Sequence, residues 1–412
     1  MSQRITLFIC FAVGYFLSNF YRAANAVIAG DLGRDLQLTA ADLGLMTSLF
    51  YAGFALVQLP LGAALDRLGP RVTLPALMMA TAAGSLLFAS AHSFAPLAAG
   101  RTLIGVGMAG MLMGAIKAFG AWFDPRRVAT ITSLLVGIGA SGGLAAATPL
   151  AWLNERFGWR AVFLWGAVAV LVSAAGIALG TRNAPRGVAW RAAPGAPGGG
   201  FGQIFRDLRF WRIAPLNFFL IGTMLAVQTL WGGPYLFDVL HLAPVQAGNL
   251  LLFLSGGVVA GYFACGPLAD RFGAQRVTVA AVAVFAAAQL VFLLPGWMPP
   301  AALIAVVFFG FGFTGAFNLL QLAEIRALFP PHMSGRAATA VNMFGFAGAA
   351  LLQWWMGLII GAFPRDTAGH YPPAAYAAAF GFTLVGTALA LAWYASPGGA
   401  WWRQDVERSP GA

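Results

Sequence analysis

The sequence GAALDRLGPR at residues 62–71 returns in related form as GPLADRFGAQR at residues 266–276. In both copies an Asp-Arg pair is followed by a glycine and then by a further arginine. Asp66 and Asp270 are 204 positions apart, and a second echo pairs Phe123 with Phe329 at an offset of 206. Repeats with nearly equal offsets predict a chain built from two copies of one structural unit.

The composition places both copies in a membrane. Of the 412 residues, 60% are hydrophobic and 9% are charged, whereas a soluble domain has about 25% charged residues. Because a membrane helix needs about 20 apolar residues, the chain has room for twelve. Apolar stretches occur at residues 5–29, 42–65, 72–91, 95–122, 128–150, 159–179, 210–237, 244–268, 276–295, 299–323, 336–362 and 373–396. This pattern predicts an all-α integral membrane protein and excludes a disulfide scaffold and a large soluble domain.

A segment rich in arginine, proline and glycine separates the sixth stretch from the seventh. Such a composition is typical of a flexible linker. We therefore expect two pseudo-symmetric six-helix bundles, at residues 1–180 and 210–397. A cytoplasmic linker at 181–209 joins them, and a cytoplasmic tail follows at 398–412.

The net charge of +11 is explained by topology. If both termini are inside, 17 of the 24 cations lie in inner segments, four lie in outer loops and three lie within helices. An excess of arginine and lysine in the inner loops sets the orientation of membrane helices. The sequence therefore predicts a multi-pass protein of the cytoplasmic (inner) membrane with both termini in the cytoplasm. The charge needs no nucleic-acid partner.

Three cations lie inside predicted helices, namely Arg22, Arg101 and Lys117. No Asp or Glu lies mid-membrane in the first six helices, and an unpaired charge at that depth costs several kcal/mol. Lys117 can extend to the inner interface near Trp122. Arg101 has two possible roles, as a tie to a neighbouring helix or as a second positive element of the site. Arg22 is deeper, so we expect an electropositive cavity in which the substrate itself is the missing anion.

Polar groups on the apolar helices provide further lining candidates. A buried amide in a membrane helix often joins two helices instead of binding a substrate, so each alone leaves both roles open. With Arg22 and Arg101, the substrate-binding candidates are Tyr21, Asn25, Tyr51, Gln228, Trp231, Asn318, Gln321 and Asn342.

The repeated Asp-Arg loop resembles the signature loop of the major facilitator superfamily, and the resemblance covers the whole chain. It implies twelve helices in two bundles and an inner gate, in which Asp66 faces the positive N-terminal end of a helix and an arginine. The gating candidates are Asp66, Arg67, Arg71, Arg126, Asp270, Arg271 and Glu324.

A narrower resemblance rests on Tyr21-Arg22, on Phe50-Tyr51 and on the run from Lys117 to Arg127. These segments are similar to the anion:cation symporter branch of the superfamily. The resemblance implies that the arginine of helix 1 binds a substrate carboxylate. Several members of the branch carry coupled protons on two acids, but Tyr21 and Met108 occupy the corresponding regions here. The sequence therefore departs from the branch at both of its proton-carrying positions.

The sequence thus predicts a secondary active transporter that moves a small organic anion by rocker-switch alternating access, as a monomer in the lipid bilayer. The coupling ion, H⁺ or Na⁺, is left open. One alternative is an efflux antiporter for apolar or drug-like compounds, although no membrane acid is available to bind cations. A second is a transport-dead sensor or assembly factor with the same fold. Because no acid/base or metal constellation is visible, we expect neither an enzyme nor a cofactor.

Overall fold

The computed structural model describes residues 3–185, 201–294, 300–367 and 369–396. Within these ranges the chain is helical and has no strand. Eleven helical segments of the described chain are long and apolar enough to cross a membrane, and a shorter apolar helix at Thr130–Ala145 corresponds to the remaining predicted span. The predicted all-α membrane fold is confirmed. Residues 186–200 of the predicted linker and the predicted tail at 398–412 lie outside the described residues.

The N-terminal half contains eight helices because two of the predicted spans are interrupted. The first span breaks at Ala24 and the fourth at Ala109 and Gly110. The helices are α1 (Gln3–Ala23), α2 (Asn25–Asp35), α3 (Ala40–Arg67), α4 (Pro70–Ala89), α5 (Phe94–Met108), α6 (Met111–Trp122), α7 (Pro125–Ala145) and α8 (Thr148–Gly180). Helix α8 starts before the predicted apolar stretch, because a short segment precedes the kink at Gly158, where φ is +75°.

The C-terminal half follows the short helix α9 (Phe201–Arg206) and has the same order of spans. Its seventh and tenth spans are interrupted, as the first and fourth are. Its elements are α10 (Leu208–Ala226), the π-helix η1 (Val227–Trp231), α11 (Gly232–Asp238), α12 (Pro244–Phe272), α13 (Ala274–Leu290), the 3₁₀ turn η2 (Val291–Leu293), α14 (Ala301–Gly315), α15 (Asn318–Leu328), α16 (Pro331–Gly361) and α17 (Pro373–Ala395).

The repeated loops have the same backbone conformation. Gly69, between α3 and α4, has φ of +76°, and Gly273, between α12 and α13, has φ of +88°. Side chains other than glycine rarely adopt such angles. A Cβ at Gly69 would also lie 2.1 Å from the Asn183 side chain. The glycine of the repeat therefore ends one helix and directs the chain into the next.

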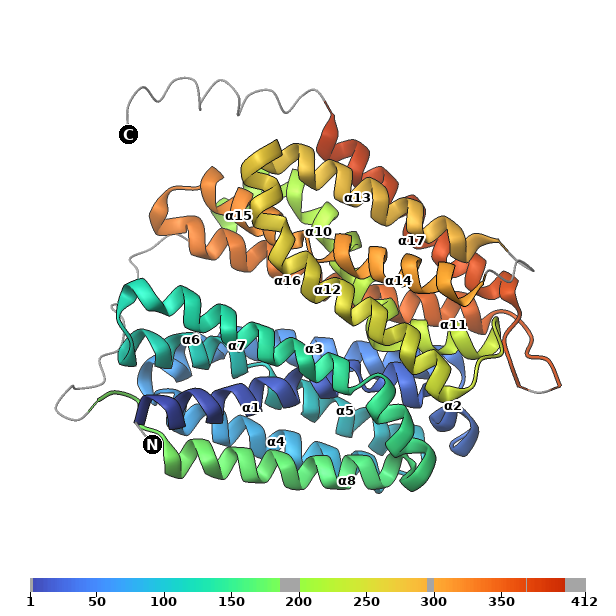
Figure 1. The fold of residues 1–412 in the computed structure, drawn as a ribbon, viewed down its shortest axis with the longest axis horizontal. Helices are drawn as coiled ribbons and strands as arrows, with labels where there is room; N and C mark the ends of the chain where they lie inside the picture. Colours follow the sequence, from blue (N-terminus) through green and yellow to red (C-terminus); the bar gives the residue numbers. More distant parts are fainter. Residues whose placement is uncertain (1–2, 186–200, 295–299, 368, 397–412) are drawn as a thin grey trace.

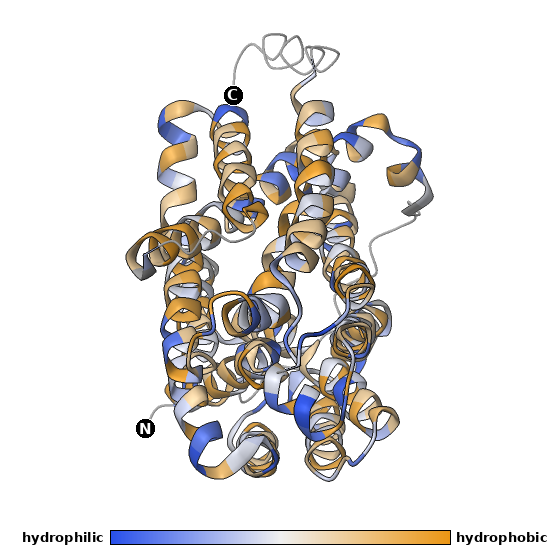
Figure 2. Cartoon of the chain, turned by 90° about the vertical axis from the view of Figure 1, so that its right-hand side faces the viewer, coloured by the Kyte–Doolittle hydropathy of each residue, from blue (hydrophilic) through white to orange (hydrophobic). Residues whose placement is uncertain are grey.

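The two halves lie against each other along one side, as Figure 1 shows. They are close at the end that carries α2 and α11 and diverge toward the end that carries α6 and α15 (Figure 1). Viewed from the α2 and α11 end, apolar residues cover much of the helix surface in both halves (Figure 2). Large apolar side chains are exposed on several helices, among them Leu56, Phe263 and Leu389. Such surfaces fit a lipid environment.

Candidate functional site

The break between α1 and α2 lies next to the first candidate residue, Arg22. Where a helix ends, its last carbonyls lack intrahelical donors, and in a membrane other protein groups must supply them. Arg101 of α5 does so: its Nη1 donates to the Tyr21 carbonyl at 2.7 Å and its Nη2 to the Arg22 carbonyl at 3.4 Å. Its guanidinium lies 4.5 Å from the Phe50 ring centroid. Arg101 is fully buried, which supports the helix-tie role.

Arg22 has different surroundings. Its side chain is only half-buried, and its guanidinium carbon lies 5.3 Å from the ring centroid of Phe54 and 5.9 Å from that of Phe346. Phe54 belongs to α3 of the N-terminal half and Phe346 to α16 of the C-terminal half. Within the described part of the chain no carboxylate pairs with Arg22, and its buried Nε has no hydrogen-bond partner. Ring faces hold this cation, and its N–H groups remain available for an anion.

Three aromatic residues lie beside Arg22. The sequence analysis did not select Phe54 and Phe346, but it did select Tyr51, whose ring stacks on that of Phe346. The Tyr15 ring packs over Gly139 of α7, where a Cβ would lie 2.1 Å from it. An aromatic residue on an apolar helix resembles any core residue in sequence, so no sequence signal could have singled out Phe54 or Phe346.

The remaining N-terminal candidates use their polar groups in contacts between helices. The Tyr21 hydroxyl lies 2.7 Å from Ser85 Oγ of α4, within the same half. Asn25 donates to Thr47 Oγ1 at 3.0 Å. The Tyr51 hydroxyl donates to Thr229 Oγ1 of the C-terminal half at 3.3 Å. All three side chains are buried.

The C-terminal candidates form a polar group of amides. Gln228, which is half-buried, donates to Ser255 Oγ at 3.4 Å. Trp231 is buried and donates to the Gln353 carbonyl at 3.1 Å. Gln321 accepts a 2.9 Å hydrogen bond from Asn217.

Two amide side chains of this half each have a buried polar atom that makes no hydrogen bond. Asn318 Oδ1 and Gln321 Nε2 are buried without a hydrogen-bond partner. Asn342 is half-buried on α16. Asn217 lies in the apolar helix α10. It was not selected from the sequence, because a single asparagine in an apolar helix forms no recognisable motif. The structure adds it to the polar residues of this half.

The structure corrects the expectation that the membrane cations of the first half lack acidic partners. Lys117 of α6 forms an ion pair with Asp66 at the end of α3. Both side chains are about one-third exposed or less. The two residues are 51 positions apart, and Asp66 was expected to face an arginine, so the sequence did not indicate this pairing. Lys117 is therefore neutralised, and the electropositive character of the interior rests on Arg22 and Arg101.

The other gating candidates of the N-terminal half lie in the loop after α3. Arg67 is exposed. Arg71 donates from Nε to the Ala178 carbonyl at 2.8 Å, and its backbone N–H donates to Asn183 Oδ1 at 2.8 Å. Asn183 also donates to the Leu68 carbonyl at 3.1 Å. The repeated loop is thus attached to the end of α8. Arg126 lies in α7, and its side chain is outside the described residues.

The corresponding loop of the C-terminal half is arranged differently. Asp270 and Arg271 are both exposed, and Arg271 lies over the ring of its neighbour Phe272 at 5.2 Å. Glu324 in α15 is half-buried and accepts a 2.6 Å hydrogen bond from the Tyr394 hydroxyl. Glu324 and Tyr394 line a small cavity together with Arg209 and Arg212.

Close contacts join the two halves at the α2 and α11 end. A Cβ at Gly44 of α3 would lie 2.6 Å from the Gln353 carbonyl of α16, so only glycine allows the backbones this close. The Ala40 N–H donates to the Tyr371 hydroxyl at 3.0 Å, and Arg365 donates to the Leu38 carbonyl. Thr148 and Asn249 share a 2.6 Å hydrogen bond. These contacts close this end of the molecule.

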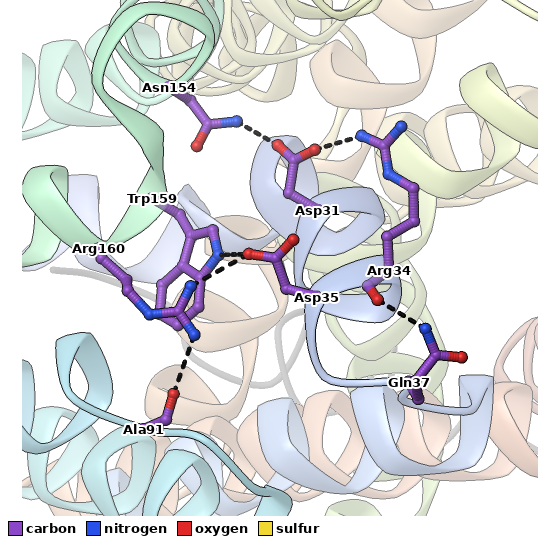
Figure 3. A network of polar contacts seen from close by, with 8 residues as sticks. All are labelled: Asp31, Arg34, Asp35, Gln37, Ala91, Asn154, Trp159 and Arg160. Carbon is purple, nitrogen blue, oxygen red and sulfur yellow. Dashed lines mark hydrogen bonds and ion pairs between the residues drawn. The ribbon is translucent and has the colours of Figure 1, made fainter.

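Polar contacts also attach α2 to its own half at this end, as Figure 3 shows. Asp35 accepts hydrogen bonds from Trp159 Nε1 at 2.9 Å and from Arg160 at 3.1 Å (Figure 3). Asp31 pairs with Arg34 and accepts from Asn154. The acids of α2 therefore have partners on α8, which stabilises the position of α2 beyond the break near Arg22.

Known proteins match this chain over most of its length. A family model described as Major Facilitator Superfamily matches residues 11–353. The chain is 25% identical to a gentisate transporter of Corynebacterium glutamicum over 80% of this chain and 75% of that protein. It is 24% identical to a putative tartrate transporter of Agrobacterium vitis over 92% of this chain and 87% of that protein.

The fold is also known from solved structures. A bacterial homolog of the human lysosomal transporter Spinster has a TM-score of 0.74 at 20% identity, with 96% of each chain covered. The relatives named as organic-anion transporters agree with the resemblance to the anion:cation symporter branch. The chain is a multi-pass membrane transport protein and not an enzyme. It belongs to the major facilitator superfamily.

Proposed function

We propose that this secondary transporter moves a small organic anion and that Arg22 binds the anion's carboxylate. The observation that carries the proposal is the contrast between the two arginines near the α1–α2 break. Arg101 uses its donors on backbone carbonyls, whereas Arg22 is held by ring faces. A guanidinium without a counter-ion at this depth is costly, so an anionic substrate would lower the free energy of the site.

Alternating access would operate between the two halves. Because Phe346 comes from the C-terminal half and Arg22 comes from the N-terminal half, an anion at Arg22 lies where the halves meet. The α2 and α11 end is joined by hydrogen bonds and the opposite ends of the ribbons diverge. We assign the diverging end, which carries the repeated loops, to the cytoplasm, on the excess of cations in those loops.

The remaining features of the proposal follow the sequence. The protein works in the cytoplasmic membrane, as two bundles at 1–180 and 210–397, and as a monomer because the site is formed within one chain. Asp66, Arg67 and Arg71 act in the inner gate, together with Lys117, which pairs with Asp66. Gln228, Asn318, Gln321 and Asn342 provide polar lining on the C-terminal side.

Transport by the purified protein in lipid vesicles tests the proposal. We expect uptake of radiolabelled carboxylates that Arg22→Gln reduces by about 100-fold or more, since a charge-assisted, two-point contact to carboxylate is lost. Phe263→Leu, at a 69% exposed position on the outer surface of α12, is the matched control and should transport normally. Normal carboxylate transport by folded Arg22→Gln would contradict the assignment. Arg22-independent transport of apolar cations would favour the efflux alternative.

A further inference from the structure

The carboxylates of the described residues lie at or near helix ends, kinks and loops, away from the middle of the spans. Five of them form ion pairs, namely Asp31 with Arg34, Asp35 with Arg160, Asp66 with Lys117, Asp207 with Arg209 and Asp238 with His370. Glu324 accepts a hydrogen bond from Tyr394, and Asp42 caps α3. The others, Asp124, Glu155, Asp270 and Asp366, are exposed. Within the described chain, none of these acids neutralises Arg22.

The surroundings of Arg22 stabilise its charge only in part. Its guanidinium carbon lies 5.3 Å from the Phe54 ring centroid and 5.9 Å from that of Phe346, and its buried Nε has no hydrogen-bond partner. A contact with a ring face is weaker than a hydrogen-bonded pair with a carboxylate. Because an arginine keeps its charge over the physiological pH range, the empty site carries an uncompensated positive charge.

Buried contacts join the two halves beside this charge. The Phe54 and Phe346 ring centroids are 4.9 Å apart across the halves, and the Tyr51 ring stacks on Phe346 with centroids 6.2 Å apart. The Tyr51 hydroxyl donates to Thr229 Oγ1 of the opposite half at 3.3 Å, and Gln353 Nε2 donates to the same oxygen at 2.9 Å. Tyr51, Thr229 and Gln353 are fully buried. When the opposite ends of the halves also approach during alternating access, Arg22 is enclosed on both sides.

In such an enclosed state, the loaded and the empty carrier differ by one charge. A bound carboxylate makes a neutral pair with Arg22 and uses its N–H groups. Without the anion, a desolvated cation is left among rings, which is costly. A proton or sodium ion bound beside Arg22 would add to this positive charge instead of removing it. The carrier can therefore change its orientation readily only when an anion is bound.

We infer that the protein is an obligatory anion exchanger, which changes its orientation only while an organic anion occupies Arg22, so that one anion enters as another leaves. The inference rests on the proposed function and adds the mode of transport. The coupled partner is a second anion on the opposite side of the membrane, and no proton or sodium ion accompanies either anion. Arg22 thus has two roles: it binds the carboxylate and, when it is unoccupied, it prevents the return of the empty carrier.

Efflux from lipid vesicles tests the exchange. The probes are radiolabelled gluconate and 4-hydroxybenzoate, each of which carries one carboxylate at neutral pH. We expect efflux to be at least about 100-fold faster into buffer that contains the same unlabelled carboxylate than into buffer with a bulky sulfonate as its anion, because the empty carrier would enclose an unpaired charge. Equal efflux into both buffers would overturn the inference. Accumulation driven by a proton or sodium gradient into vesicles without internal carboxylate would also overturn it.

Variants test whether charge limits the movement of the empty carrier. Fluorophores at exposed Ser90 and Ala243, one in each half, would report switching between arrangements by single-molecule energy transfer. Without carboxylate, Phe346→Glu should switch at least about ten-fold faster than Phe346→Gln, its uncharged control of the same size, because only the glutamate pairs with Arg22. Arg22→Gln should also switch without carboxylate. Equal switching in Phe346→Glu and Phe346→Gln, or slow switching in Arg22→Gln, would overturn the inference.

The outcomes also distinguish this inference from the proposed function. If efflux of either probe depends on Arg22 but needs no external carboxylate, the exchange mode is wrong while anion transport at Arg22 stands. If the flux of neither probe depends on Arg22, the proposed function fails and the inference fails with it. Arg22-dependent efflux that requires an external carboxylate would support both.

Discussion

The two halves of the molecule share a repeated loop, but they differ in the polar side chains of their membrane-spanning helices. Gly69 and Gly273 have nearly the same backbone conformation, and Asp66 and Asp270 occupy the same position in each repeat. The N-terminal half nevertheless contains three membrane cations, whereas the C-terminal half contains amides and, near the ends of its interrupted spans, the acids Asp238 and Glu324. The repeat thus preserves the helical frame, and the chemistry of binding differs between the two copies. This asymmetry is what suits the molecule to an anion held from one side.

The largest expected effect compares Arg22 with Gln228, its counterpart at similar depth in the seventh span. Arg22→Gln should lower the kcat/KM of carboxylate transport by about 100-fold, which corresponds to about 2.7 kcal/mol. Gln228→Ala should lower it by about ten-fold or less, since a neutral hydrogen bond is weaker than a charge-assisted one. Initial rates of uptake into lipid vesicles provide the measurement. Equal losses in the two variants would mean that the halves contribute alike to anion binding.

The second comparison concerns stability and sets Arg101 against Trp231. Both side chains are buried and donate to backbone carbonyls of another helix. Arg101→Leu leaves two carbonyls at the α1–α2 break without these donors and should cost about 2–3 kcal/mol of stability. Trp231→Phe removes one neutral hydrogen bond and should cost about 1 kcal/mol. Thermal unfolding in detergent measures both losses of stability. A larger loss for Trp231→Phe than for Arg101→Leu would contradict the role of Arg101 in stabilising the α1–α2 break.

The third comparison concerns the repeated loops. Asp66 pairs with Lys117, while Asp270 is exposed. Asp66→Asn should therefore change the transport rate by about ten-fold, because an ion pair between α3 and α6 is lost, and Asp270→Asn should change it less than about two-fold. Lys117→Gln is the matched partner variant and should resemble Asp66→Asn. A stronger effect at Asp270 would show that the C-terminal loop dominates the gate.

The smallest expected effect concerns the contacts that close the α2 and α11 end. Tyr371→Phe removes the acceptor for the Ala40 N–H and keeps the ring, on which Arg365 lies at 4.6 Å. We expect a shift of about three-fold in the equilibrium between the closed and open arrangements of this end. Distances between spin labels at exposed Ser90 and Ala243, one in each half, would report it. An unchanged distance distribution would mean that this hydrogen bond does not hold the halves together.

Much of the fold could be predicted from the sequence because it depends on local chemistry. The apolar lengths predicted the spans, and the Asp-Arg-x-Gly pattern predicted the repeated turn, since a glycine at positive φ is a local requirement. The breaks at Ala24 and at residues 109–110 were not predicted. Arg22 and Asn25 flank the first break and two glycines, Gly107 and Gly110, lie at the second, but no proline marks either interruption. The breaks are tolerated because neighbouring groups such as Arg101 provide donors.

The candidate site was predictable only in part. The hydropathy of the sequence showed that Arg22 and Arg101 lie deep in the membrane. It could not show which of the two uses its N–H groups on backbone carbonyls. That difference depends on where the backbone of α1 ends relative to α5, which is a contact between residues about 80 positions apart. For the same reason the partner of Lys117 and the ring faces of Phe54 and Phe346 were missed.

The sequence by itself determined the membrane environment, the duplicated twelve-span frame and the presence of rare charges at depth, because the cost of placing a polar group in hydrocarbon constrains composition residue by residue. Only the tertiary structure decided which charges are neutralised. Lys117 meets Asp66, Arg101 meets the carbonyls of the broken helix, and Arg22 meets two phenylalanine rings, one from each half. Pairing depends on which side chains helix packing brings within a few ångströms, and that information is spread over the whole chain.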